Sequence, residues 1–246
     1  MRALHERLHF LNLMEDEDFD ILDDLHAKTA VYSAGTIIQR ENGPIELTRF
    51  IVSGWAIKFQ TSPAGRRQIL SFLIPGDSIG LYGALFQNSE SGLEVIAEIM
   101  VAEIPSVELM SIFKRSPRLG AALCWIGGQD ERFLHHQILR LGALRATPRL
   151  AHILIELHLR LLRVGIPPAE ASIIPINQKL IGEALGITHV HANRCCRELV
   201  KMGLIETTSR KVKLLDPSEL KRLCVYEENW GGAQLPPSSR RWLGGS

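Results

Sequence analysis

Residues 175–205 read PINQKLIGEALGITHVHANRCCRELVKMGLI and carry the signals for two helices joined by a tight turn. Asn177 can cap the first helix, and Gly186 supplies a turn in which a positive φ is favourable only without a Cβ. Thr188 can cap a second helix, which Gly203 ends. The predicted inward positions of the two helices are Leu180, Ile181, Leu185, Ala192, Cys195, Leu199 and Met202. This arrangement predicts a helix-turn-helix motif.

The outward face of the second helix carries side chains that suit the major groove of DNA. Arg194 can form a bidentate pair with guanine that contributes roughly 1–3 kcal/mol of base discrimination. Asn193 suits adenine or a phosphate, and the Thr188 hydroxyl at the positive helix end suits a phosphate. Residues 204–216, LIETTSRKVKLLD, then predict a two-stranded wing with cations for the DNA backbone. The predicted DNA-binding residues are Thr188, His189, Val190, Asn193, Arg194, Arg197, Arg210, Lys211 and Lys213.

The distribution of charge favours this interpretation over a helical hairpin with a solvated charged face. Residues 1–144 carry 13 Lys and Arg against 18 Asp and Glu, a net charge of −5. Residues 145–225 carry 13 against 7, a net charge of +6, although the whole chain of 246 residues has a formal charge of only +1. A basic segment that follows an acidic one is typical of a chain whose second part meets a polyanion.

The first half of the chain predicts a sheet preceded by one short helix. The helix is DEDFDILDDLHAK, residues 16–28, with Phe19, Leu22 and Leu25 at helical spacing. From Thr36 to about Pro105 only strands are indicated, in the runs TIIQ, TRFIVS, WAIKFQT, RQILSFLI and VIAEIMVAEIP. The clusters ENGP, SG, SPAGR and IPGDS separate these runs as turns. Short, evenly spaced strands favour an antiparallel sandwich or roll.

Helical signals return after Pro105. Residues 106–115, SVELMSIFKR, predict a short helix, and a longer one is expected from about Pro117 to Leu141. The apolar stripe of the long helix, which is expected to pack against the same helix of a second copy, comprises Leu119, Leu123, Ile126, Phe133 and Leu141. The alternative is that this helix packs only on its own roll. Gly127 and Gly128 lie in mid-helix, where glycine weakens a helix.

A further helix is expected to begin with Thr147 as its cap and Pro148 in its first position. Its buried side is predicted to carry Leu150, Leu154, Leu157 and Leu161, and the loop GIPPAEAS is expected to end it. The segment from Val225 onward is rich in Gly, Pro and Ser, so it is predicted to be a disordered tail.

The order of these elements resembles the Crp-Fnr family of bacterial transcription regulators over about residues 10–224. The segments that carry the resemblance are YSAGTIIQREN, IVSGWAIKF, LIPGDSIG, GALRATPRLAHILIELHL and, most specifically, ITHVHANRCCREL, which is similar to a VHxNR subgroup. Arg194 matches the base-reading arginine of the family. Val190 stands where many members carry glutamate, so an operator preference does not transfer to this chain.

The resemblance implies an α+β fold with three parts and a tail. The expected boundaries are an antiparallel, cyclic-nucleotide-binding-like β-roll at 10–116, a dimerisation helix at 117–144, a winged helix-turn-helix at 145–224 and the tail at 225–246. The implied function is that of a homodimeric, non-enzymatic regulator of transcription on near-palindromic operators. Its expected partners are double-stranded DNA, a second copy and RNA polymerase, together with a small-molecule effector that the sequence does not identify.

The residues that hold known ligands in this family do not recur here, so no cofactor or metal is expected. Members that bind cyclic nucleotides carry an acid and an Arg-Ser pair in the stretch that reads IGLYGALFQNSESGLEVIAE here. Leu81 replaces the acid, and no arginine occurs between Arg67 and Arg115. The first cysteine is Cys124, and the spacing of the four cysteines cannot assemble a four-thiolate iron-sulfur site. Haem binding through the roll would need a histidine, and none lies between His26 and His135.

The cysteines, the histidines and the function each admit an alternative interpretation. Cys195 and Cys196 are candidates for a redox-sensitive pair near the DNA, or else inert core residues. His135, His136, His189 and His191 are expected to be structural or surface residues rather than metal ligands. A roll-based metal enzyme and a constitutive DNA binder with a ligand-free roll are the rival functions. The chain has no apolar run of about 18 residues, so no membrane is expected as a partner and a cytoplasmic location is predicted.

Overall fold

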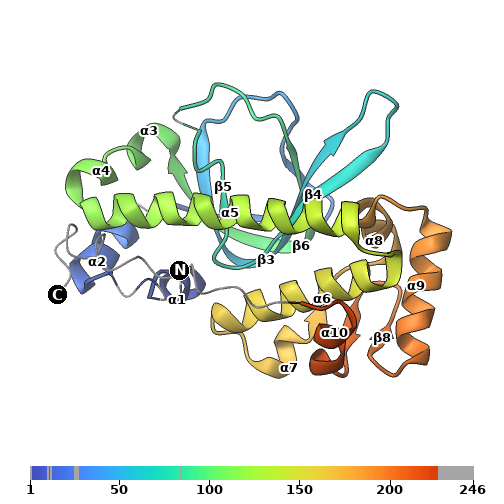
Figure 1. Ribbon diagram of the computed structural model, residues 1–246. Helices are drawn as coiled ribbons and strands as arrows, with labels where there is room; N and C mark the ends of the chain where they lie inside the picture. The colour runs from blue at the N-terminus through green and yellow to red at the C-terminus, as the bar shows by residue number, and fades with distance from the viewer. Residues whose placement is uncertain (1, 10, 12, 25–27, 84, 227–246) are drawn as a thin grey trace. The chain divides into compact units, whose positions relative to one another are not determined.

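The computed structural model describes residues 2–9, 11, 13–24, 28–83 and 85–226 (Figure 1). The chain forms two compact units. Unit 1 contains the described residues up to Ala56 and from Leu73 to Arg132, and unit 2 contains Ile57–Phe72 and the described residues from Phe133 onward. Unit 2 thus includes a hairpin, Ile57–Phe72, that lies within the sequence of the predicted roll.

Unit 1 is built on an antiparallel sheet, in agreement with the predicted roll. Its strands are β1 (Lys28–Tyr32), β2 (Ile37–Gln39), β3 (Leu47–Thr61), β5 (Ser78–Ile79) and β6 (Gly92–Pro105). β6 lies between β1 and β3, β2 also pairs with β6, and β5 pairs with β3. The inward side chains of this sheet, among them Ile51, Val95, Ile99 and Val101, form one apolar cluster.

β3 differs from the prediction of two strands separated by a turn at Ser53–Gly54. It is a single strand of 15 residues. Gly54 has φ +86°, and a Cβ on it would lie 2.0 Å from the carbonyl oxygen of Glu98 on β6. The glycine therefore permits a close approach of two backbones rather than a turn. β1 was not predicted, because only a short run of strand-forming residues marks it.

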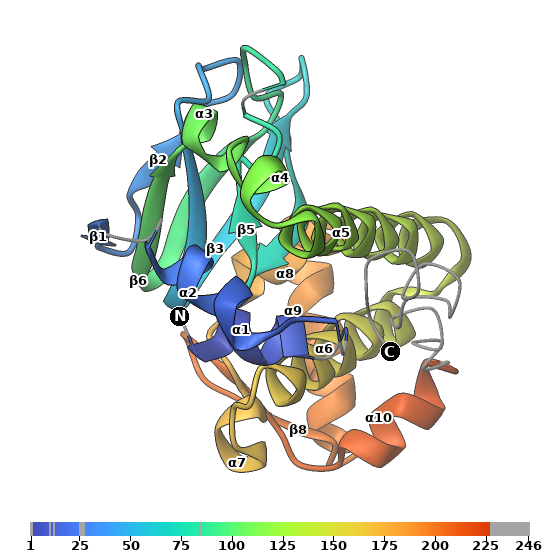
Figure 2. The same ribbon diagram turned by 90° about the vertical axis from the view of Figure 1, so that its left-hand side faces the viewer.

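Among its described residues, unit 1 includes five helices or parts of helices. They are α1 (Arg2–His9), α2 (Asp16–Asp24), α3 (Ser106–Leu109), α4 (Ile112–Arg115) and the first part of α5 (Pro117–Ala143). α1 was not predicted, and the helix expected at 106–115 is divided into α3 and α4. α2 confirms the acidic helix, with Phe19 and Leu22 buried, whereas Leu25 lies outside the described residues. The His5 ring of α1 lies against Phe19 of α2, and Figure 2 shows the two helices side by side.

The buried stripe of α5 requires a correction. Leu119, Leu123 and Ile126 lie in the apolar core of unit 1, together with Leu4 and Leu8 of α1. Phe133 is also buried in its own chain, where the Arg160 guanidinium lies 4.1 Å from the centre of its ring. Leu141 is partly buried. The assignment to a dimer contact is therefore wrong for Leu119, Leu123, Ile126 and Phe133, because other elements of the same chain cover them.

Unit 2 contains the elements that follow α5 along the chain. They are α6 (Ala146–Arg163), α7 (Pro168–Ala171), β7 (Ile173–Ile174), α8 (Gln178–Leu185), α9 (His189–Lys201), β8 (Ile205–Thr207), β9 (Val212–Leu214) and α10 (Pro217–Leu223). α6 contacts α7, α8, α9 and α10, and the predicted inward residues Leu150, Leu154, Leu157 and Leu161 are buried. The three short strands form a sheet in the order β7-β9-β8. Unit 2 also holds the end of β3 and most of β4 (Arg67–Leu73), which form the hairpin Ile57–Phe72.

Three predictions around α6 and the tail were wrong in detail. The cap of α6 is Arg145 rather than Thr147, and the GIPPAEAS loop contains the short helix α7. The predicted tail begins at Val225, but Tyr226 is buried and its ring lies 4.7 Å from that of His152. The rest of the predicted tail, residues 227–246, lies outside the described residues. None of the helices in the described part of the chain combines the length and the apolar character that crossing a membrane requires.

The close approach at Gly54 can be tested with the substitution Gly54→Ala. We expect it to lower the free energy of unfolding by roughly 3–5 kcal/mol, because the new Cβ collides with the backbone of β6 and the positive φ is unfavourable. Gly35 has φ +87° with no atom within 4 Å of its Cβ position, so Gly35→Ala should cost only about 1–2 kcal/mol. Urea unfolding of both variants measures the difference. Equal losses would show that the contact with Glu98 is unimportant.

Candidate nucleic-acid interface

The predicted caps and turn of the helix-turn-helix are present in the structure. The Leu180 amide donates to Oδ1 of Asn177 at 3.0 Å, and the His191 amide donates to Oγ1 of Thr188 at 3.3 Å. Gly186 ends α8 in the left-handed region with φ +68°. These contacts satisfy backbone groups that a helix end would otherwise leave unpaired, so they determine where each helix begins and ends.

The buried faces of α8 and α9 confirm most of the predicted inward positions. Leu180, Ile181, Leu185, Ala192, Cys195 and Leu199 are buried. Met202 is 50% exposed, so its assignment to the inward face was wrong. Met202 follows the last helical residue, Lys201, so the helical period no longer determines the direction of its side chain.

The structure leaves the predicted DNA-binding residues accessible. Thr188, His189, Val190, Arg194, Arg197, Arg210, Lys211 and Lys213 are exposed, and Asn193 is half-buried. The Arg194 side chain is 71% exposed on the second turn of α9. The N-terminal half of α9 therefore offers a polar, cationic surface of the kind that enters a major groove.

The wing is a short antiparallel ladder with an ordered tip. β8 pairs with β9 from Ile205 opposite Leu214 to Thr207 opposite Val212. Oγ1 of Thr208 accepts from the amides of Arg210 at 3.3 Å and Lys211 at 3.2 Å. β7 is a third strand that the sequence did not indicate, and it pairs with β9. The tip thus holds Arg210 and Lys211 in a defined turn.

An open groove of about 550 Å³ lies between the start of α8, the start of α9 and the wing. Its lining residues are Asn177, Gln178, Lys179, His189, Thr207, Thr208 and Ser209. Of these residues, all except His189 were absent from the predicted DNA-binding residues. Gln178 and Lys179 could have been found from the helix start after Asn177, because the N–H groups of a helix N-terminus and a nearby lysine suit a phosphate.

Glu198 is a second residue that the sequence analysis missed. Its Oε1 lies 3.3 Å from Nε of Arg194, and its Oε2 accepts from Oγ1 of Thr147 at 2.5 Å. The hydrogen bond from Thr147, followed by that from Arg194, lowers the pKa of the Glu198 carboxyl. A carboxylate on the helical turn after the candidate base-reading arginine could have been recognised from the i, i+4 spacing.

Arg149 of α6 joins the ends of two helices. Its Nη1 donates to the Leu185 carbonyl at the end of α8, at 2.8 Å. Its Nη2 donates to the carbonyls of Leu141 and Leu144, near the end of α5, at 3.0 and 2.8 Å. One guanidinium therefore satisfies carbonyls at the C-termini of both helices, as a cation at this place is expected to do.

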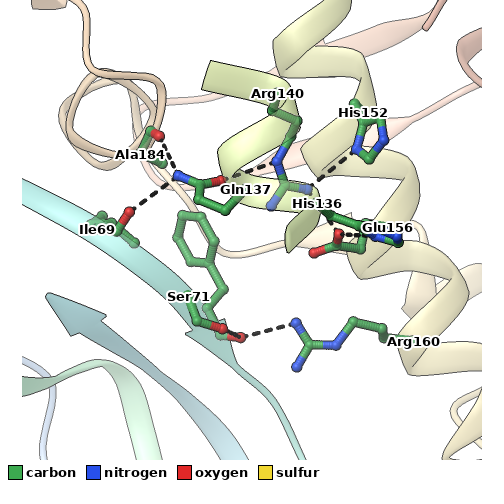
Figure 3. Close-up of polar contacts among 10 residues, drawn as sticks. Ile69, Ser71, His136, Gln137, Arg140, His152, Glu156, Arg160 and Ala184 are labelled. Atoms are coloured by element: carbon green, nitrogen blue, oxygen red, sulfur yellow. Dashed lines mark hydrogen bonds and ion pairs between the residues drawn. The ribbon is translucent and has the colours of Figure 1, made fainter. Parts of the chain in front are cut away.

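A buried polar network around Arg140 joins α5 to α6 (Figure 3). Nη1 of Arg140 donates to Oε2 of Glu156 at 2.8 Å and lies 3.2 Å from Nδ1 of His152. Nδ1 of His136 lies 3.2 Å from the same Glu156 oxygen. Arg160, one turn further along α6, donates to the Phe72 carbonyl at 3.1 Å.

The same network continues to the hairpin and to α8 through two glutamines. Nε of Arg140 donates to Oε1 of Gln137 at 3.0 Å. Nε2 of Gln137 donates in turn to the carbonyls of Ile69 at 3.2 Å and Ala184 at 2.8 Å. Gln68 of the hairpin also donates to Ala184, at 3.1 Å, and its neighbour Arg67 forms an ion pair with Glu183 at 3.1 Å. The hairpin is therefore attached to α8, the first helix of the helix-turn-helix.

The pKa values of this network follow from burial and from Arg140. Burial, reinforced by the positive charge of Arg140, lowers the pKa of His152 to about 4. Burial acts to raise the pKa of Glu156, but Arg140, the hydrogen bond from His136 and Arg160 lower it to about 2. At neutral pH the network therefore contains a charged Arg140–Glu156 pair beside a neutral His152.

The positions of the cysteines favour the alternative of inert core residues over a redox-sensitive pair on α9. Cys195 and Cys196 are both buried. Burial and the neighbouring Cys195 raise the pKa of the Cys196 thiol to about 11, which disfavours the reactive thiolate. Cys224 is also buried, and Cys124 on α5 is exposed. Among the described residues, no group of three or more His, Cys, Asp and Glu side chains could hold a metal ion.

The stability of unit 2 should depend on pH through His152. In the unfolded chain this histidine becomes protonated near pH 6.5, whereas in the folded protein it stays neutral down to about pH 4. The free energy of unfolding therefore falls as the pH falls between these values. Glu156 acts in the same direction only below about pH 4.5, because its stabilising charge is lost as the pH approaches 2. We expect His152→Asn to reduce the loss of unfolding free energy between about pH 7 and pH 5 by roughly 1–2 kcal/mol. Urea unfolding of both proteins over this range tests it, and an unchanged pH dependence would contradict it.

Comparisons with known proteins agree with this architecture. Residues 29–116 match the family of cyclic nucleotide-binding domains, and residues 148–223 match the Crp-like helix-turn-helix domains. The chain is 26% identical over 204 residues to the transcriptional activator protein Anr of Pseudomonas aeruginosa, covering 83% of each chain. It is 25% identical over 217 residues to the transcriptional regulatory protein Btr of Bordetella pertussis, covering 87% of this chain and 88% of that protein.

Solved structures show the same fold. FixK2 from Bradyrhizobium japonicum superposes with a TM-score of 0.71 at 24% identity, over 81% of this chain and 98% of that one. A transcriptional regulator of the CRP/FNR family from Thermus thermophilus superposes with a TM-score of 0.64 at 20% identity, over 81% of this chain and 99% of that one. The two matched domains, the related regulators and the shared fold agree with the helix-turn-helix that α8 and α9 form. The chain belongs to the Crp-Fnr family of DNA-binding transcription regulators.

Proposed function

We propose that this regulator acts as a homodimer that places one α9 helix in each half-site of a near-palindromic operator. The half-sites of such a dimer lie about one helical turn, roughly 34 Å, apart. The observation that carries the proposal is the exposed, cationic N-terminal half of α9, flanked by an ordered wing with Arg210 and Lys211. Direct contact with base edges supplies the specificity of the complex.

Arg194 is the proposed base reader. Its side chain is 71% exposed, and its contact with Glu198 uses Nε, one of five N–H donors on the guanidinium. Other donors of the same group can pair with O6 and N7 of guanine. His189, Val190, Asn193 and Arg197 lie on the same helix and complete the proposed major-groove surface.

The groove between α8, α9 and the wing is the proposed site for a DNA phosphate. It lies at the N-terminus of α8, which favours an anion, and is lined by Lys179, His189 and three hydroxyl side chains of the wing. Thr188, Arg210, Lys211 and Lys213 add contacts to the backbone on either side. Because such contacts release counterions, the affinity for DNA should fall steeply with salt.

The proposed dimer contact is the outward face of α5, in place of the stripe that the chain itself covers. Its exposed residues repeat at steps of three and four and comprise Cys124, Gly128, Glu131, His135, Ile138 and Gly142. No atom lies within 4 Å of the Cβ position of Gly128, and Ile138 is 68% exposed. Small residues and a large apolar one at heptad spacing suit a parallel pair of helices about a twofold axis.

The remaining assignments divide the chain by role. The roll at 10–116 is the proposed sensor region, 117–144 the dimerisation helix and 145–224 the DNA-binding domain. RNA polymerase and an unidentified small-molecule effector are proposed as further partners, and the cytoplasm is the proposed location because the DNA is there. The related proteins are regulators, so we propose no enzymatic activity.

The base reader can be tested with DNA selected by the wild-type protein from a random library. Arg194→Ala should reduce discrimination at one guanine of the selected sequence by roughly 5- to 150-fold, which corresponds to 1–3 kcal/mol. Lys211→Ala should weaken binding to all sequences alike and lower the slope of log affinity against log salt by about one. Gel-shift titrations over a series of salt concentrations measure both effects. If Arg194→Ala retained the wild-type preference, Arg194 would not be the reader.

The dimer contact can be tested through the native cysteines, because Cys124 is exposed and the other three are buried. A short bismaleimide should link two wild-type chains through Cys124, and Cys124→Ser should abolish the linkage. Ile138→Asp should shift the protein to monomers in sedimentation at micromolar concentration, because two carboxylates would then meet in an apolar contact. A wild-type monomer at this concentration, or a dimer that Ile138→Asp leaves intact, would refute the proposed face.

A further inference from the structure

Glu198 connects the candidate base reader to the first turn of α6. One carboxylate oxygen lies 3.3 Å from Nε of Arg194, and the other accepts a hydrogen bond from the Thr147 hydroxyl. All three residues belong to unit 2. The carboxylate is 46% exposed, and Arg194 is the more exposed partner at 71%. The chain of contacts therefore begins at a fixed helix terminus and ends at a guanidinium on the DNA-binding surface.

The stability of α9 alone does not account for an acid at this position. An arginine that precedes a glutamate by four residues is the less favourable order for an ion pair within a helix. Glu198 also lies in the last turns of α9, which ends at Lys201, where the helix dipole disfavours a negative charge. On a surface that meets phosphates, the same charge lowers the affinity for any DNA. A residue with these three costs is expected to contribute something other than helix stability.

We propose that Glu198 is a positioning residue that orients the Arg194 guanidinium for guanine, and that Thr147 holds Glu198 in place. The proposal rests on the proposed function, in which Arg194 reads a base. A long arginine side chain loses rotamer freedom when it binds, and a fixed carboxylate at Nε reduces that loss before the DNA arrives. The other N–H donors of the guanidinium then meet the base in a defined plane.

The hydrogen bond between Thr147 and Glu198 also links the base reader to the turn between α5 and α6. Thr147 follows Arg145, the cap of α6, and the preceding helix α5 ends at Ala143. Arg149, two residues beyond Thr147, binds carbonyls at the end of α5 and at the end of α8. The turn that connects the two long helices is thereby linked to the base reader. A change in that turn would alter base discrimination more than overall affinity.

The test uses the full-length protein and the DNA selected from a random library by the wild type. The position read by Arg194 is the base pair at which Arg194→Ala loses discrimination. Thr147→Val keeps the volume of the side chain and removes the donor, and it should lower discrimination at that base pair roughly 3- to 10-fold with an unchanged salt slope. Thr147→Ser keeps the hydroxyl, so base discrimination should stay at the wild-type value.

Glu198→Ala provides the second arm. It should lower discrimination at the same base pair and raise the affinity for non-specific DNA, because a negative charge is lost from the binding surface. In a double-mutant cycle, Glu198→Ala should have no further effect on discrimination in the Arg194→Ala background. Thermal unfolding of each variant confirms that the compared proteins are folded.

The outcomes separate the two proposals. If Arg194→Ala abolishes discrimination while Thr147→Val and Glu198→Ala leave it at the wild-type value, the positioning role is overturned and the base reader stands. If Glu198→Ala changes the preference at a neighbouring cytosine only, Glu198 reads that base directly and the positioning role is again overturned. If Arg194→Ala leaves discrimination intact, the proposed function itself fails at its reader.

Discussion

The buried pair of Arg140 and Glu156 is the constraint on which the arrangement of unit 2 depends. An ion pair removed from water is stable only when its geometry is good and its remaining polar atoms are satisfied. Here Gln137, His136 and His152 supply those further contacts, and Gln137 extends them to the hairpin and to α8. Removing either charge would leave the other buried without compensation. The network therefore favours one arrangement of α5, α6 and the first DNA-binding helix over looser alternatives.

The DNA-binding surface differs from this buried network because its polar side chains face the solvent. Most of its side chains are exposed, so they are available to a ligand. Its precision comes from the backbone beneath it, where Asn177, Gly186 and Thr188 determine the start and end of each helix. Arg149 and the Arg140 network attach that backbone to α5. The binding surface thus consists of side chains that project from helices whose ends are fixed by caps, as specific recognition requires.

The sequence predicted those features that depend on residues close to one another along the chain. The caps, the turn at Gly186 and the inward faces of α8 and α9 depend on residues within one or two helical turns, and the sequence was sufficient for them. The stripe on α5 was recognised as buried, but periodicity does not say what covers a buried face, and here α1 and its neighbours do so. Gly54 was read as a turn because the approach of β6 is a contact between residues distant in sequence. Glu198 was missed because its role depends on Thr147, which lies on another helix.

The hairpin Ile57–Phe72 has a consequence for how such regulators can be recombined. It lies in the sequence of the roll, but Gln68 and Arg67 bind α8, so it belongs physically to the DNA-binding half. A chimera that joins the roll of one relative to the helix-turn-helix of another at the α5–α6 connection would leave these pairs mismatched. Exchangeable modules in this architecture are consequently discontinuous in sequence. A graft that includes its own hairpin keeps the native contacts between the hairpin and α8.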